Sequence, residues 1–300
     1  MNWTGTAILS AAVFALVSIF DSYLLTRRMP GLRVFLLLSG VVYLVYGLIL
    51  VYLFPLPEGI GIVPILVAIV SGIFRTAGVT IMIFTLKREE VSRVLPVYHT
   101  YPIFVAIIAI PLLGESLNYL HWLAIIIVVA AAAIISVEKS STGSTSRLSR
   151  SFLLLFISSL CMAVSDTTSK YSLSYLSFWN VYTISLFCMG SISWLISIRP
   201  DTIKQLSEMK QKSQTITILF CNEIMAPVAM GLMFWAQSRG PISLVSTILA
   251  TRPVFVAIYS IILGLVFPGF LMRTSSGRVI IIRFIATILI VGGISIIYLQ

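Results

Sequence analysis

Long, uninterrupted apolar segments constrain the fold of this sequence more than any other feature. The hydrocarbon core of a bilayer is about 30 Å thick, and about 20 helical residues span it. Segments of that length recur throughout the 300 residues, of which 59% are hydrophobic and 10% charged. Because these runs are continuous rather than alternating, they predict an all-α membrane protein and not a β-barrel. We predict ten transmembrane helices, at 4–26, 33–54, 62–86, 91–113, 119–137, 152–173, 178–198, 216–236, 242–266 and 279–298.

Basic residues are concentrated on alternate connections between these segments. Of the 20 Lys and Arg residues, 16 lie in the first, third, fifth, seventh and ninth connections or within the first turns of the spans that follow them. Positively charged loops face the cytoplasm, so this bias predicts that both termini lie outside. Attraction to anionic lipid headgroups explains the positive charge more simply than a nucleic acid does. We therefore expect the lipid bilayer, and no nucleic acid, as a partner.

The sequence repeats itself at about half its length. Thr-Tyr-Pro-Ile-Phe-Val-Ala-Ile at 100–107 recurs as Thr-Arg-Pro-Val-Phe-Val-Ala-Ile at 251–258, an offset of 151 residues. Asp21-Ser22 also resembles Asp166-Thr167, at an offset of 145 residues. Self-similarity over half a chain predicts a duplicated structural unit.

Each half contains five of the predicted helices. An odd number of spans makes the second copy enter the membrane from the opposite face, so the two repeats are expected to be inverted. In transporters built this way, the solute site forms near the bilayer midplane, between the repeats. We divide the chain into a first repeat (1–137), an inter-repeat loop (138–151) and a second repeat (152–300).

The motif positions resemble the EamA-type domain of the drug/metabolite transporter superfamily over essentially the whole chain. The resemblance is carried by Ser92, Pro102-Ile-Phe104, Leu113-Gly114-Glu115 and Pro253-Val-Phe255. Members export amino acids and other metabolites or move nucleotide sugars and phosphorylated sugars, by proton coupling or by exchange. The resemblance thus implies a secondary transporter of a small solute in the cell membrane. The chain departs from the family in having Val266 where the second half aligns with Glu115, and ten-helix relatives are usually described with both termini inside.

Six ionisable side chains are predicted to lie deep in the spans. They are Asp21, Arg75, His99, Asp166, Glu223 and Arg252. A charged group in a span costs roughly 2.5–3.5 kcal/mol and needs a partner, a wet cavity or a function. In one interpretation an arginine pairs with Glu223 or Asp166 and holds helices together. In the other, both arginines line a cavity and bind a carboxylate or phosphate through forked hydrogen bonds, which predicts an anionic or zwitterionic solute.

The candidate site follows from these residues and from the distorted fourth helix. Pro96 and Pro102 are expected to free backbone carbonyls toward a cavity. The substrate-binding candidates are Arg75, Tyr98, His99, Tyr101, Asn222, Glu223 and Arg252, and the proton-coupling candidates are Asp21, Asp166 and Glu223. Ordinary packing is the alternative for the tyrosines, and a contact between helices is the alternative for Asn222.

An enzyme, a channel and a flippase would each need a feature that differs from those of a solute transporter. The two histidines, His99 and His121, stand 22 residues apart, so no metal or nucleophile motif is visible, and neither an enzyme nor a cofactor or metal is expected. A channel would show a repeated filter or a ring of charge. A lipid-linked carrier or flippase of the same fold would need a lateral opening between helices, and it remains the alternative function. A monomer and a homodimer are both compatible with the sequence.

Overall fold

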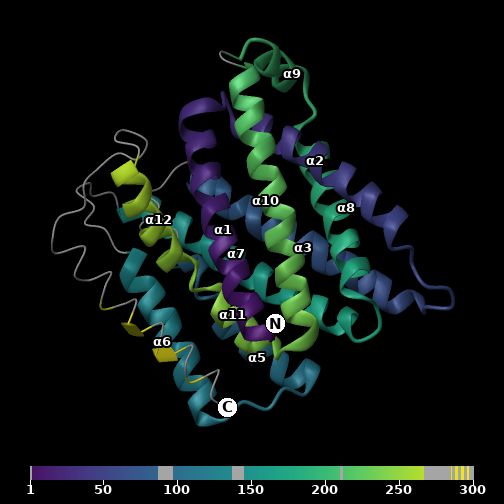
Figure 1. Ribbon diagram of the computed structural model, residues 1–300, viewed down its shortest axis with the longest axis vertical. Helices are drawn as coiled ribbons and strands as arrows, with labels where there is room; N and C mark the ends of the chain where they lie inside the picture. The colour runs from purple at the N-terminus through teal and green to yellow at the C-terminus, as the bar shows by residue number, and fades with distance from the viewer. Residues whose placement is uncertain are drawn as a thin grey trace.

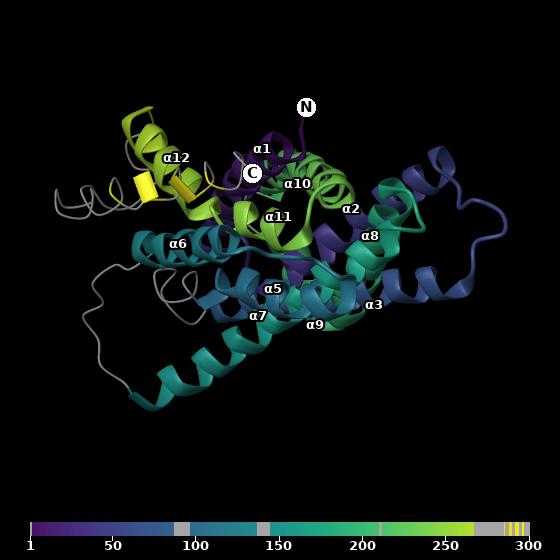
Figure 2. The ribbon, with the colours of Figure 1, turned by 90° about the horizontal axis from the view of Figure 1, so that it is seen from below.

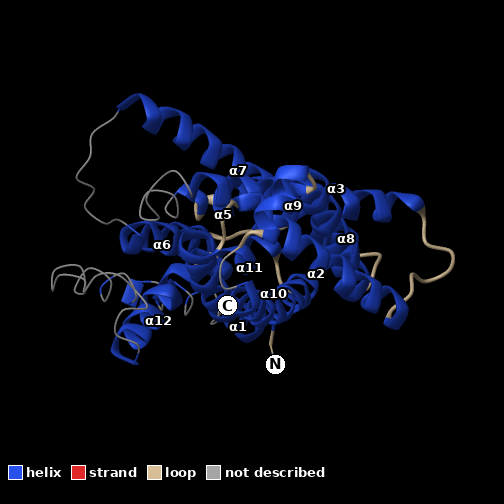
Figure 3. Cartoon of the chain, turned by 90° about the horizontal axis from the view of Figure 1, so that it is seen from above, coloured by secondary structure: helices blue, strands red, loops and turns tan. Residues whose placement is uncertain are grey.

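The described part of the chain is built of α-helices joined by short connections (Figure 3). The computed structural model describes residues 2–86, 97–136, 145–209 and 212–266, six positions between 285 and 296, and no side chains at 86, 132–150, 261 and 264–266. The helices are α1 (Trp3–Tyr23), continued by the π-helical turn η1 (Leu24–Arg28), α2 (Leu32–Leu53), α3 (Ile62–Leu86), α5 (Tyr101–Leu113), α6 (Tyr119–Ser136), α7 (Thr145–Leu173), α8 (Phe178–Ser197), α9 (Pro200–Ser207), α10 (Lys212–Arg239), α11 (Ile242–Leu249) and α12 (Arg252–Val266).

The helices confirm an all-α protein that crosses the membrane several times. Within the described residues, seven helical segments are long and apolar enough to span a bilayer, and two shorter apolar helices accompany them. The predicted span 91–113 is described only from residue 97 onwards, and the predicted span 279–298 lies mostly outside the described residues. The total of ten spans therefore stays a prediction.

Three helix boundaries differ from the sequence-based expectation. The predicted span 242–266 is broken into α11 and α12, because Pro253 removes a backbone hydrogen bond that a continuous helix would need. Helix α7 already begins at Thr145, inside the predicted inter-repeat loop. The polar stretch 199–215 contains the short helix α9, with Pro200 in its first turn, where a missing N–H costs nothing.

Helix α3 runs antiparallel to α7, and serine side chains join them. Ser172 Oγ donates to the carbonyl oxygen of Pro64 at 3.0 Å, near the start of α3. At the other end of the pair, Ser158 Oγ donates to the carbonyl oxygen of Gly78 at 2.7 Å. Small hydroxyl residues let two backbones approach closely and bond across the interface, as is common in membranes.

Helix α1 packs in the same antiparallel way against α10 (Figures 1 and 2). Ser10 Oγ donates to the carbonyl oxygen of Ala229 at 2.8 Å. Towards the end of α10 the indole of Trp3 covers Gly240, leaving no room for a larger residue there. Figure 1 shows α9 at the end of the bundle opposite the N-terminus. The basic connection around α9 and the N-terminus thus lie at opposite ends of the helices.

Helices α2 and α8 form the third close pair. A Cβ atom on Gly40 would lie 3.1 Å from the carbonyl oxygen of Gly190, so the two backbones touch at this crossing. Further along the pair, Asn180 Nδ2 on α8 donates to the carbonyl oxygen of Phe54, which caps α2, at 3.0 Å. The buried apolar core gathers around α1, α8, α10 and α11.

Candidate functional site

The two motifs of the repeat occur at matching breaks in the helices. Thr100 Oγ1 donates to the carbonyl oxygen of Val97 at 2.7 Å, and Thr251 Oγ1 donates to that of Ile248 at 2.7 Å. The backbone N–H groups of both threonines donate to the same two carbonyls, at 3.2 and 3.0 Å. Each motif therefore ends one helical segment in a tight turn and starts the next. The distortion expected from Pro102 is present, and its counterpart at Pro253 has the same local geometry.

The residue after each threonine is a predicted site residue. Tyr101 is buried, and its hydroxyl donates to the carbonyl oxygen of Ser246 on α11 at 3.2 Å. Arg252 occupies the equivalent position in the second half. Its guanidinium lies 4.4 Å from the ring centroid of Phe14 on α1, and its buried Nε has no hydrogen-bond partner within the described part of the chain. Arg252 has no ion pair among the described residues.

His99 and Tyr98 precede the first break. His99 is 2% exposed, and its ring meets that of Tyr98 edge-on at 5.3 Å. No described residue is a hydrogen-bond partner of its Nδ1. Ser159 on α7 donates to the carbonyl oxygen of Tyr98 at 3.2 Å, which fixes the end of this segment. Arg252 interacts electrostatically with Tyr98, His99 and Tyr101, so the predicted residues of both broken helices share one neighbourhood.

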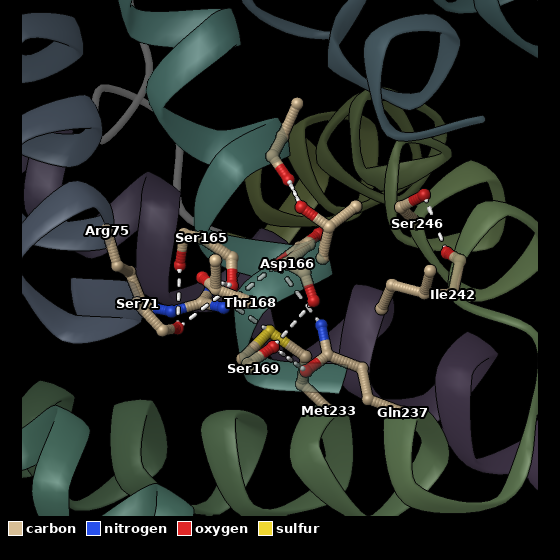
Figure 4. Close-up of polar contacts among 12 residues, drawn as sticks. Ser71, Arg75, Ser165, Asp166, Thr168, Ser169, Met233, Gln237, Ile242 and Ser246 are labelled. Atoms are coloured by element: carbon tan, nitrogen blue, oxygen red, sulfur yellow. Dashed lines mark hydrogen bonds and ion pairs between the residues drawn. The ribbon is translucent and has the colours of Figure 1, made fainter. Parts of the chain in front are cut away.

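Arg75 forms an ion pair with Asp166 (Figure 4). Its Nη2 lies 2.8 Å from Asp166 Oδ1, and the two side chains are 5% and 1% exposed. Gln237 Nε2 donates to the same carboxylate oxygen at 3.2 Å, and the Arg75 guanidinium also lies 5.2 Å from the centroid of Phe234. Of the two interpretations of Arg75, the ion pair between helices is the one that the geometry shows. Of the guanidinium nitrogens of Arg75, Nε has no hydrogen-bond partner among the residues described.

Asp21, Asn222 and Glu223 form a second polar cluster between α1, α2 and α10. Asn222 Nδ2 donates to Asp21 Oδ1 at 2.7 Å. Ser39 Oγ donates to Glu223 Oε1 at 2.5 Å, and Tyr43 adds a side-chain interaction with the same carboxyl group. Asn222 Oδ1 and Glu223 Oε2 are buried and have no hydrogen-bond partner of good geometry in the described segments. Glu223 thus has neutral partners only, whereas Asp166 is paired with Arg75 and Asp21 interacts with Arg252.

Arg252 links the two clusters electrostatically. It interacts with Asp21, and Asp21 in turn interacts with Glu223. Tyr98 and Tyr101 both interact electrostatically with Arg75 and Asp166. The predicted site residues therefore lie in one region of the bundle, contributed by α1, α3, α7, α10 and the two broken helices. Of the two arginines in this region, Arg252 is the one without a carboxylate at ion-pair distance among the residues that the structure describes.

Glu115, part of the Leu-Gly-Glu motif, joins the two halves outside this region. Gly114 ends α5 in the left-handed conformation, with φ of 65°, and so turns the chain towards α11. The Glu115 carboxylate accepts hydrogen bonds from the backbone N–H groups of Ile242 and Ser243 and from the Ser243 hydroxyl. It thereby satisfies the free donors at the start of α11 and lies at the positive end of that helix.

Sequence reasoning missed the neutral partners of the charged residues. Ser39 donates a hydrogen bond to the carboxyl group of Glu223, and Gln237 donates one to that of Asp166. Ser169 in turn donates to Gln237 Oε1 at 3.3 Å. A signal was present, because Gln237 is an amide within a long apolar helix. Its partner could be identified only once α7 and α10 were placed side by side.

Comparisons with known proteins agree with the fold and with the motifs. Residues 1–137 match the EamA-like transporter family. No curated protein matches the sequence. A protein of known crystal structure is similar over 99% of this chain and 95% of its own, at 18% identity and with a TM-score of 0.64, a likeness that shows the fold alone. The first half of the chain therefore matches the EamA-like transporter family, which belongs to the drug/metabolite transporter superfamily, and the chain is an integral, multi-pass membrane protein.

Proposed function

We propose that the protein is a secondary active transporter that carries a small anionic or zwitterionic metabolite across the cell membrane by alternating access. The observation that carries the proposal is Arg252. A guanidinium inside a membrane protein is expensive to keep without a close counter-charge. This one packs on the ring of Phe14, and among the described residues it has no carboxylate at ion-pair distance and its Nε has no hydrogen-bond partner. Its planar, forked donors suit a carboxylate or a phosphate, so the solute supplies the missing anion.

Two inverted five-helix repeats would place this arginine between moving halves, and the helix pairing supports that arrangement. The first and third helices of one half pair with the third and first helices of the other, as α1 with α10 and α3 with α7. Both pairs are antiparallel, as expected if the second copy is turned over. The second helices of the halves, α2 and α8, pair with each other. This exchange pattern is what a two-fold axis in the membrane plane produces.

The broken helices supply the second element of the mechanism. Discontinuous helices at the repeat interface present helix ends and unpaired backbone groups to a solute. Here both breaks stand at the same position of the repeat, next to Tyr101 and Arg252. Rocking of one repeat against the other would expose this region alternately to the two sides.

Glu223 is our candidate for coupling to a proton gradient. Asp166 is held by Arg75, and Asp21 faces both Asn222 and Arg252. Glu223 instead has a serine and a tyrosine as partners and no cation at ion-pair distance among the described residues. A buried carboxyl group without a cation is stable only when it carries a proton. The solute would then bind to Arg252 and the proton to Glu223, and Asp21 interacts with both residues.

Transport in proteoliposomes tests the function. Amino acids, sugar phosphates and nucleotide sugars are screened for uptake against protein-free liposomes, and we expect accumulation of an anionic or zwitterionic member and none of its neutral analogue. Equal accumulation of the neutral analogue would contradict the role of the arginine. Glu223→Gln, which mimics the protonated acid, should lose uptake driven by a pH gradient and keep solute-for-solute exchange. Undiminished gradient-driven uptake would remove Glu223 from coupling.

A further inference from the structure

A recess of about 550 Å³ lies between α2, α8 and α10, apart from the polar clusters. Aromatic residues form much of its wall, including Tyr46 on α2, Trp179 and Tyr182 on α8 and Trp235 on α10. Two hydroxyl groups on the wall are already engaged: that of Tyr182 donates to the carbonyl oxygen of Pro227 at 2.9 Å, and that of Thr6 to the carbonyl oxygen of Asn2. The recess therefore offers an occupant mainly apolar contact.

The recess opens towards the lipid. Val228, which lines it, is 54% exposed and continues a stripe of exposed apolar residues on α10, at Phe220 and Ile224. In a membrane such a stripe faces acyl chains. From Trp235 to Pro227 the recess follows α10 for about 12 Å, at about 1.5 Å per residue. It is thus an elongated apolar slot that enters the bilayer core from one end of the helices.

Packing at the slot is looser than where α3 crosses α8. A Cβ atom on Gly72 of α3 would lie 2.7 Å from the Cβ of Cys188 on α8. On the side of the recess, a Cβ atom on Gly231 would meet only Tyr182, at 3.8 Å. Gly231 therefore has room for a larger side chain, whereas Gly72 does not.

A cation stands beside the wall of the slot. The guanidinium of Arg239, at the end of α10, lies 4.4 Å from the ring centroid of Trp235, and Arg239 is exposed. Trp3, packed on Gly240, and Trp179 lie near the same end. Tryptophans gather at the level of the lipid headgroups, where an exposed arginine meets phosphate groups. We propose that the slot binds one phospholipid with an anionic headgroup, its acyl chain between α2 and α10 and its phosphate on Arg239.

The proposal is independent of the transported solute and is tested by lipid binding. The full-length protein is purified in detergent and delipidated, and phosphatidylglycerol or phosphatidylcholine is added before native mass spectrometry. We expect one phosphatidylglycerol to be retained and phosphatidylcholine to bind about tenfold more weakly. Arg239→Gln should weaken phosphatidylglycerol binding about tenfold, because a charge-assisted hydrogen bond is lost. Arg199→Gln, which removes the same charge from an exposed site near α9, should leave binding unchanged.

A second experiment fills the slot with a larger side chain. Gly231→Phe should abolish retention of the lipid, whereas Gly231→Ala should keep it, since the added methyl group makes only an ordinary contact with Tyr182. Equal retention by wild type and Gly231→Phe would overturn the acyl-chain site. Equal affinity for the two lipids would overturn the preference for an anionic headgroup, because phosphatidylcholine also carries a phosphate but no net charge. Equal weakening by Arg239→Gln and Arg199→Gln would overturn the contact between the phosphate and Arg239. Competition by a water-soluble aromatic compound without a phosphate would show that the slot binds free aromatics and not a lipid.

Discussion

Replacing Asp166 by Asn removes the acid of the buried ion pair and leaves the Arg75 guanidinium charged between apolar helices. The pair is short, at 2.8 Å, and both side chains are almost fully buried. Two unit charges about 4 Å apart attract each other by about 4 kcal/mol at an effective dielectric constant of about 20. Removing one partner of a buried pair typically costs about 3–5 kcal/mol. We expect Asp166→Asn to lower the free energy of unfolding by about 3 kcal/mol, because Gln237 still donates to the remaining oxygen.

The double variant Arg75→Gln with Asp166→Asn distinguishes the cost of an unpaired buried charge from the cost of losing the side-chain contacts themselves. It buries no unpaired charge, so we expect it to recover about 2 kcal/mol relative to Asp166→Asn alone. The assay is reversible unfolding in mixed micelles, followed by circular dichroism, for wild type, both single variants and the double variant. If Asp166→Asn were within about 0.5 kcal/mol of wild type, or if the double variant were less stable than both single variants, the ion pair would not hold α3 to α7 as we infer.

Three further predictions test the cap of α11, the contact between α3 and α8, and the orientation of the protein in the membrane. Glu115→Ala should lower the free energy of unfolding by about 1–2 kcal/mol, because the first N–H groups of α11 lose their acceptor; thermal unfolding in detergent measures this, and an unchanged midpoint would contradict the cap. Gly72→Ala should cost about 1–3 kcal/mol through its clash with Cys188, whereas Gly231→Ala, the matched control, should cost less than about 0.5 kcal/mol; equal effects would refute the tight α3–α8 contact. A cysteine at Glu58 should be labelled from outside intact cells by a membrane-impermeant reagent and one at Ser207 should not, and the reverse result would contradict the orientation drawn from the basic loops.

The apolar pattern predicted the helices better than it predicted their neighbours. A run such as 33–54 specifies a span through its length and hydropathy alone, and α2 occupies Leu32–Leu53. The pattern holds no information on which span lies beside it. The pairing of α2 with α8 depends on a contact between Gly40 and Gly190, which are far apart in the sequence.

The repeat motif was informative because its residues act locally. Thr100 and Thr251 each bond to the carbonyl three residues earlier, so the same short sequence produces the same break in both halves. The partners of the charged residues could not be read in this way. For Arg75 the sequence left Glu223 and Asp166 open, and Asp166 was identified only by the packing of α7 on α3. Glu115 is a similar case, since the start of α11 that it caps lies in the other half.

The central claim is that Arg252 holds the anionic group of a transported solute. The most direct measurement is the initial rate of solute uptake by Arg252→Gln, compared in matched proteoliposomes with wild type and with Arg199→Gln. We predict that Arg252→Gln, folded by its size-exclusion profile, transports at less than about one hundredth of the wild-type rate, because a charge-assisted, forked contact is lost, while Arg199→Gln retains the full rate. Uptake by Arg252→Gln at the rate of the Arg199→Gln control would contradict the account.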